Sequence, residues 1–143
     1  MAKKNYKNIE LAPKYVPKKS EPYMCVEQLA YFYNLLNGQR EEILQERDSV
    51  LSDVRMAEKS ETAGVGDEQD KASAEQEITM NLRMNERNSN LLEKINAALE
   101  RIENGTFGYS VISGEEIGLQ RMLARPLATM TIEEQEEHEQ KNK

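Results

Sequence analysis

Residues 78–102 read ITMNLRMNERNSNLLEKINAALERI. Within this stretch a narrow stripe of side chains recurs at steps of three and four residues, and it consists of Ile78, Leu82, Asn85, Ser89, Leu92, Ile95, Leu99 and Ile102. So narrow a stripe is typical of a helix that packs along one seam against a second helix. We expect the polar residues Asn85 and Ser89 to lower the stability of the seam and to fix its register.

A second stripe of the same kind lies earlier in the chain, and it consists of Leu29, Phe32, Leu36, Ile43, Val50 and Val54. It predicts one helix from Val26 to about Glu58, which would be roughly 50 Å long. The run Thr62–Gly66 then interrupts the pattern with two glycines. Such a run indicates a reversal of the chain between two helices.

The second helix is predicted to begin at Asp67 or Asp70 and to end at Glu103, because an Asn-Gly pair typical of helix C-termini follows it. Two long helices joined by a short turn form an antiparallel coiled-coil hairpin over residues 23–104, with its tip near residues 60–72. We expect a monomer, because the seam is filled within one chain. The predicted fold class is mainly α.

Residues 105–143 are predicted to form a small globular module with a C-terminal helix. One helix is expected from Glu115 to Ala124 and a final helix from about Thr131. Two capping boxes precede these helices, Ser113 to Glu116 and Thr131 to Glu134, and each places a hydroxyl at the N-cap and a carboxylate three residues later. The apolar side chains available to the module are Phe107, Tyr109, Ile117, Leu119 and Leu123.

Residues 1–22 form a basic tail. Residues 1–20 contain six lysines and one glutamate, so they carry a net charge of +5 and leave −12 for the rest of the chain. The prolines Pro13 and Pro17 and the scarcity of large apolar residues predict an extended, solvated leader. The alternatives are a clasp onto the acidic body of the chain and a weak anchor for an acidic partner.

Composition excludes several classes of protein. The chain has 143 residues, 31% of them charged, with a single cysteine and a single histidine. Cys25 and His138 cannot form a zinc cage or a disulfide framework, and we interpret them as an incidental thiol and a solvated side chain. No apolar run approaches the roughly 20 residues of a membrane span, and no secretory signal is present, so a cytoplasmic protein is expected.

Two further functions are disfavoured. No nucleophile–base pair and no phosphate-binding loop occurs in the sequence, so an independent enzyme is not expected. The net charge of −7 disfavours nonspecific binding to DNA.

Four stretches of the chain, in order and in register, resemble the DksA/TraR family of bacterial RNA polymerase regulators. Residues 67–77, DEQDKASAEQE, resemble the DxxDxA motif at the tip of that family's hairpin. Residues 23–32 resemble the start of its first long helix, and residues 104–109 resemble the end of its second. Residues 116–126 resemble its globular module, and the whole resemblance covers about residues 22–140.

The resemblance implies a transcription regulator whose hairpin enters the secondary channel of RNA polymerase. The tip of the hairpin would change the stability of the open complex. The regulator itself would not bind directly to a specific DNA sequence. The tip residues that it implies are Asp67, Asp70 and Ala72. Carboxylates three residues apart on a helix could ion-pair with the polymerase or perturb its catalytic Mg²⁺, and a small Ala72 would permit close approach. Alternatively, both aspartates only cap a helix N-terminus.

The resemblance also implies a site for guanosine tetraphosphate (ppGpp), the effector of the stringent response, formed jointly with the polymerase. The matching positions are Leu91, Lys94 and Arg125, while a further basic position of the family reads Gln135 here. Arg87 matches a basic position near the polymerase rim. Alternatively, Lys94 is an ordinary exposed helix charge and Arg125 a cation at a helix C-terminus.

The chain departs from the family at the four cysteines that usually hold a zinc ion in the globular module. These positions read Ser110, Ser113, Thr131 and Glu134. Because hydroxyl and carboxylate groups do not replace thiolates in a tight tetrahedral cage, we predict a zinc-finger-like module without zinc and a chain without a cofactor of its own. Helix capping and apolar packing would then supply the stability that the metal supplies elsewhere.

Two other functions share this architecture. A coiled-coil interaction protein could keep the shape after losing the polymerase function, and a cleavage-stimulating factor would donate tip acids to hydrolysis by the polymerase. A scaffold does not require two aspartates and a small residue at the spacing of the tip motif, which favours the regulator.

Overall fold

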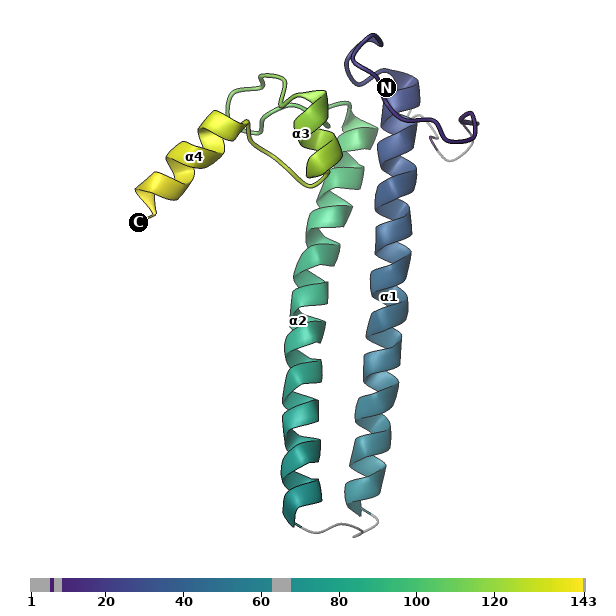
Figure 1. Ribbon diagram of the computed structural model, residues 1–143, viewed down its shortest axis with the longest axis vertical. Helices are drawn as coiled ribbons and strands as arrows, with labels where there is room; N and C mark the ends of the chain where they lie inside the picture. The colour runs from purple at the N-terminus through teal and green to yellow at the C-terminus, as the bar shows by residue number, and fades with distance from the viewer. Residues whose placement is uncertain (1–5, 7–8, 63–67, 143) are drawn as a thin grey trace. The chain divides into compact units, whose positions relative to one another are not determined.

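The computed structural model describes residues 6, 9–62 and 68–142 (Figure 1), except for the side chains of residues 54, 57–62 and 68–70. In these ranges the chain forms helices α1 (Val26–Thr62), α2 (Glu68–Asn104), α3 (Leu119–Ala124) and α4 (Ile132–Lys141). The mainly α class predicted from the sequence is confirmed. None of the helices in the described ranges is long and apolar enough to cross a membrane.

The chain divides into two compact units. The terminal unit comprises Met1–Gly38 and Lys94–Lys143, and the middle unit comprises Gln39–Glu93. Each unit contains a segment of α1 and a segment of α2, which run antiparallel (Figure 1). The predicted hairpin is therefore confirmed, and α1 continues beyond its predicted end at Glu58. The reversal between the helices falls on residues 63–67, which lie outside the described residues.

In the middle unit, α1 and α2 meet along a thin seam. Val50 of α1 and Leu92 of α2 are buried in it. Ile43 and Ile78 are half-buried, as expected for positions on the predicted stripes. Polar Asn85 is also half-buried, and its Oδ1 atom is enclosed without a hydrogen-bond partner in the described part of the chain.

The predicted stripe on α2 is wrong at two positions. Leu82 is 58% exposed, and Asn88, with 6% of its surface exposed, is buried in place of the exposed Ser89. A stripe counted in strict alternation of three and four residues drifts by about 20° per heptad around a straight helix. When the predicted stripe is extended along the whole of α2, some of its positions therefore no longer lie on the buried face of the helix.

The core of the terminal unit is formed by the start of α1, the end of α2 and the module that follows. Phe32 and Phe107 are fully buried, and their ring centroids are 5.2 Å apart. The other large apolar side chains that are fully buried are Leu36, Ile95, Ile102 and Met122. This core holds the loop after α2 against both long helices.

The loop after α2 is also attached to the chain just before α1. The hydroxyl of Tyr23 donates a hydrogen bond to the Gly108 carbonyl and accepts one from the Gly118 N–H at 3.0 Å. Gly108 has a φ of +88°, and a Cβ there would lie 2.8 Å from Cγ of Met24. Both the backbone conformation and the close packing therefore require glycine at this position.

The described lysines of the N-terminal tail, Lys14, Lys18 and Lys19, are exposed, but the tail is not solvated at its tyrosines. Tyr6 is buried and stacks near Tyr33, with ring centroids 6.1 Å apart. Tyr15 lies near Tyr31, with centroids 6.3 Å apart, and its hydroxyl donates a hydrogen bond to Glu21 at 2.8 Å. Aromatic packing on α1 thus outweighs the solvation of the lysines.

Gln28 anchors the tail from the first turn of α1. Its side chain is fully buried, and its Oε1 atom accepts a hydrogen bond from the Met24 N–H at 2.9 Å. Its Nε2 atom donates to the Lys18 carbonyl at 3.2 Å. A buried amide with both ends hydrogen-bonded fixes the path of residues 18–24.

Only one of the two predicted capping boxes forms. At α4, Thr131 N–H donates to Glu134 at 3.0 Å and Glu134 N–H donates to the Thr131 hydroxyl at 3.2 Å, as predicted. The predicted helix from Glu115, by contrast, begins at Leu119, and its N-cap is Gly118 without a side-chain hydrogen bond.

Backbone pairing explains this difference at α3. Glu116 forms an isolated antiparallel bridge with Tyr109, and Ser110 N–H donates to the Glu115 carbonyl at 2.8 Å. Ile117 N–H donates to the Gly108 carbonyl at 2.9 Å. The backbone groups that a capping box would have used therefore form a hairpin-like turn instead.

Candidate functional site

The tip motif lies at the start of α2. Asp67 falls outside the described residues, and Asp70 lies in the first turn of α2, although its side chain is not described. Ala72 and Lys71 follow on the same helix and are exposed. The roles of Asp67, Asp70 and Ala72 stay predictions.

The basic candidates lie at the surface. Arg87 and Lys94 are exposed on α2, and Leu91 between them is half-buried. Arg125 is exposed and is the C-cap of α3, where its backbone N–H donates to the Arg121 carbonyl at 2.7 Å. This position also suits the alternative interpretation of Arg125 as a cation at a helix C-terminus.

The four positions at which the family usually has cysteines do come together, as a cluster that we call the Ser–Thr–Glu cluster (Ser110, Ser113, Thr131 and Glu134). The Glu134 carboxylate accepts hydrogen bonds from the side chains of Ser110 and Ser113 and from the backbone of Thr131. The pKa of Glu134 is lowered, chiefly by the Ser110 side chain and then by the Thr131 backbone N–H.

Ser110 is the centre of this cluster. It is buried, with 5% of its surface exposed, and its Oγ accepts hydrogen bonds from the N–H groups of Ile112 at 3.1 Å and Ser113 at 3.3 Å. Its side chain is also the largest cause of the lowered pKa of Glu134. Both acceptor sites of the hydroxyl are therefore used within the chain.

The donor set of the cluster does not fit a zinc ion. Three hydroxyls and one carboxylate lack the thiolate and imidazole ligands of structural zinc sites. The lone pairs of Ser110 are already occupied by backbone N–H groups. Across the described ranges, no group of three or more His, Cys, Asp or Glu side chains is arranged to hold a metal ion.

Sequence reasoning missed one candidate, Arg101. It lies in the last turn of α2, where a basic residue looks like an ordinary helix C-terminal cation. The structure places its side chain half-buried, and burial lowers the pKa of its guanidinium. Only the tertiary position of the loop after α2 distinguishes it from an exposed arginine.

Residues 28–102 match the family model of the DnaK suppressor protein DksA, N-terminal domain. The RNA polymerase-binding transcription factor DksA of Caulobacter vibrioides is 41% identical over 129 residues, which cover 90% of this chain and 88% of that protein. The protein of the same name from Escherichia coli is 34% identical over 119 residues, with 83% and 76% covered.

The solved structures include a similar chain, transcription factor DksA2 from Pseudomonas aeruginosa. It superposes with a TM-score of 0.75 at 37% sequence identity. The match covers 88% of this chain and 92% of that chain.

Proposed function

We propose that this chain, which belongs to the DksA family, is a transcription factor that binds bacterial RNA polymerase. We propose further that it has no catalytic activity of its own. The observation that carries this proposal is the extent of the similarity, since relatives named for polymerase binding match nearly the whole chain. The chain would act as a monomer in the cytoplasm, where the polymerase is found.

The mode of action that we propose is insertion of the hairpin into the secondary channel of the polymerase. Helices α1 and α2 run antiparallel, and the described residues of the tip motif lie at the start of α2. Asp67 and Asp70 would act near the catalytic centre and alter the stability of the open complex. Ala72, which is exposed, would leave room for close approach.

Cooperation with ppGpp belongs to the same proposal. Lys94 and Arg125 present exposed cations that could bind phosphate groups, and Leu91 could contact the base or the ribose. Arg87, also exposed, would contact the polymerase rim. Gln135 offers no charge to a phosphate, so we expect weaker cooperation than in relatives with a basic residue there.

The tip is tested by transcription in vitro from a ribosomal RNA promoter, with wild type, Asp70→Asn and Glu75→Gln, each with and without ppGpp. Glu75 is exposed on the same helix and controls for the loss of one acid. We expect Asp70→Asn to bind the polymerase as tightly as wild type but to lose its effect on transcription, while Glu75→Gln keeps it. If wild type neither binds nor changes transcription, the regulator is excluded in favour of a coiled-coil protein with another partner.

We also propose that the module folds without zinc, because the Ser–Thr–Glu cluster joins the segments that a metal would join. Elemental analysis of purified protein and thermal unfolding with and without a chelator test this. We expect substoichiometric zinc and the same unfolding temperature in both conditions. Stoichiometric zinc, or a chelator-dependent fall in that temperature, would contradict the proposal.

A further inference from the structure

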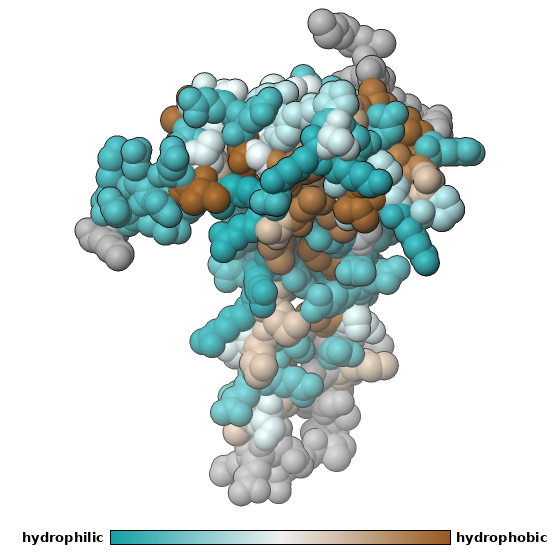
Figure 2. All heavy atoms as spheres, turned by 45° about the horizontal axis from the view of Figure 1, so that its top comes forward, coloured by the Kyte–Doolittle hydropathy of each residue, from teal (hydrophilic) through white to brown (hydrophobic). Residues whose placement is uncertain are grey.

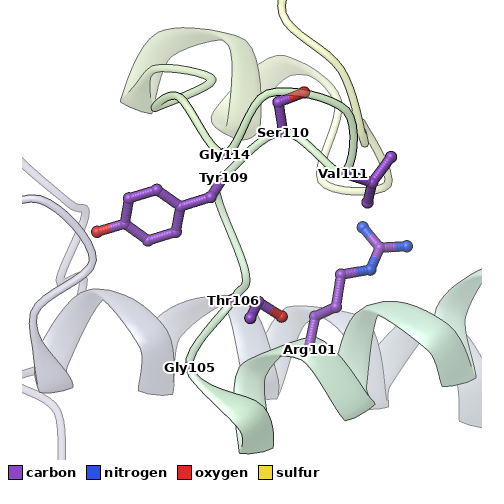
Figure 3. A pocket seen from close by; sticks show the side chains of 7 residues that line it. All are labelled: Arg101, Gly105, Thr106, Tyr109, Ser110, Val111 and Gly114. Atoms are coloured by element: carbon purple, nitrogen blue, oxygen red, sulfur yellow. The ribbon is translucent and has the colours of Figure 1, made fainter.

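A pocket lies beside the last turn of α2, under the loop that follows the helix (Figure 3). Its volume is about 630 Å³. The residues that give it its chemistry are Arg101, Thr106, Ser110 and Val111, all within the terminal unit. The guanidinium of Arg101 points across the pocket toward Val111 (Figure 3).

Arg101 lacks an anionic partner among the residues that the structure describes. Its side chain is half-buried, and burial is the sole cause that lowers its pKa, with no contribution from a carboxylate. A guanidinium that is partly removed from water without a partner is in an unfavourable environment. A carboxylate that binds its two parallel N–H groups would relieve this, because the two groups match in geometry.

Two large apolar side chains of the neighbouring loop face solvent. Val111 is 62% exposed and Ile112 is 66% exposed. The loop is nevertheless held in place, since Val111 N–H donates to the Thr129 carbonyl at 3.0 Å and Ile112 N–H donates to Ser110. Figure 2 shows apolar surface among hydrophilic atoms over the part of the molecule that carries α3 and α4. An arginine beside exposed apolar side chains on a fixed loop resembles the centre of a protein–protein interface.

We propose that Arg101, Val111 and Ile112 form a docking surface for an acidic side chain that is flanked by apolar residues on the surface of RNA polymerase. The acid would bind the Arg101 guanidinium in the pocket, and its apolar neighbours would cover Val111 and Ile112. This inference rests on the proposed function and adds a contact surface in the module to the one at the tip.

The hydrogen-bond donors of the pocket favour a carboxylate over a phosphate. The backbone N–H groups of its lining already donate within the chain, as those of Thr106, Ser110 and Val111 show. The guanidinium of Arg101 remains available. The pocket also lies at the C-terminal end of α2, where the helix dipole is negative and disfavours a multiply charged anion.

The experiment measures the affinity of the full-length chain for RNA polymerase with four variants. Arg101→Gln removes the charge, Arg101→Lys keeps the charge without the planar fork, and Ile112→Ser removes the apolar contact. Lys141→Gln, at the exposed end of α4, is the matched control for loss of one positive charge. Thermal unfolding of each variant accompanies the binding measurement.

We expect Arg101→Gln and Ile112→Ser each to raise the dissociation constant roughly tenfold. Arg101→Lys should recover part of the loss, and Lys141→Gln should bind as wild type does. The unfolding temperature of Arg101→Gln should not fall, because no partner inside the chain is lost. Weaker binding by a correctly folded variant therefore reports the interface itself.

Three results would overturn the inference. If wild type binds and both Arg101→Gln and Ile112→Ser bind equally well, the docking surface is excluded while the proposed function stands. If the free chain binds inorganic phosphate through Arg101, and Arg101→Gln still binds polymerase normally, the pocket is a small-anion site instead. If wild type does not bind polymerase at all, both the inference and the proposed function fail.

Discussion

At the scale of single residues, Glu134 joins segments that are distant in the sequence. Its backbone N–H and carboxylate complete the capping box with Thr131 at α4, and the same carboxylate accepts hydrogen bonds from Ser110 and Ser113. One side chain thus caps a helix and ties it to the loop after α2. Because these bonds favour the ionised carboxylate, the pKa of Glu134 is lowered.

The ionisation of Glu134 predicts a dependence of stability on pH. A lowered pKa in the folded state contributes stability above the ordinary value of 4.5, and this contribution is lost as the pH falls through the lowered value. We expect the free energy of unfolding of wild type to fall more steeply in acid than that of Glu134→Gln, measured by urea denaturation at a series of pH values.

Two features sharpen this comparison. Glu136→Gln removes an exposed carboxyl from the same helix and should follow the wild-type curve. The pKa of Glu21 is lowered as well, chiefly by the Lys18 backbone N–H, so some acid dependence should persist in Glu134→Gln. Identical slopes for wild type and Glu134→Gln would show that the cluster does not stabilise the fold.

Gly108 supports a second prediction at this scale. Alanine there would combine a left-handed φ of +88° with a Cβ 2.8 Å from Met24. We expect Gly108→Ala to lower the free energy of unfolding by roughly 3 kcal/mol. Gly105→Ala is the matched control, because its φ is +79° but nothing lies within 4 Å of the added Cβ, so about 1 kcal/mol is expected. Equal losses would mean that the close packing at Gly108 does not matter.

At the scale of elements, α2 carries a polar residue in its buried face. Asn88 is buried, and its Nδ2 atom has no hydrogen-bond partner in the described part of the structure. On α1, the Nε atoms of Arg40 and Arg47 are similarly enclosed without partners there. The seam of the middle unit therefore gains less from burial than an apolar seam would.

Asn88→Leu is accordingly expected to stabilise the protein. Replacing a buried amide whose Nδ2 atom lacks a hydrogen-bond partner by an apolar side chain should raise the free energy of unfolding by about 1 kcal/mol. Ser89→Leu, at the adjacent exposed position, should change it by no more than about 0.5 kcal/mol. Thermal denaturation of the two variants measures the difference. If Ser89→Leu raises the free energy of unfolding more than Asn88→Leu does, Ser89 lies on the buried face of α2, as the sequence predicted.

The long helices could be predicted from the sequence because their apolar periodicity extends over many turns. The capping box at Thr131 could be predicted because it is local. The identical pattern at Ser113 gave a wrong prediction, since the pairing of Glu116 with Tyr109 depends on tertiary contacts. The packing of Tyr6 on α1 and the half-buried Arg101 were missed for the same reason.

At the scale of the whole molecule, the two units differ in how much they bury. The terminal unit contains the fully buried pair Phe32 and Phe107 and further large apolar residues. In the middle unit, the described side chains that are buried are Val50, Asn88 and Leu92. Local stability follows the number of buried apolar contacts, so the units should open with different free energies.

Native-state hydrogen exchange tests this difference within one helix. We expect the backbone amides of α2 at residues 78–88 to exchange at least about tenfold faster than those at residues 95–102, because opening of the middle unit costs less free energy. Uniform protection along α2 would mean that the hairpin unfolds as one cooperative body.

The Ser–Thr–Glu cluster also bears on how such a module tolerates sequence change. A metal cage binds through all its ligands together, so the loss of one ligand tends to empty the site and unfold a small domain. In the cluster, Ser110, Ser113 and Thr131 each form separate hydrogen bonds with Glu134. The loss of one leaves the others in place. Stepwise divergence at these positions can thus proceed through intermediates that still fold.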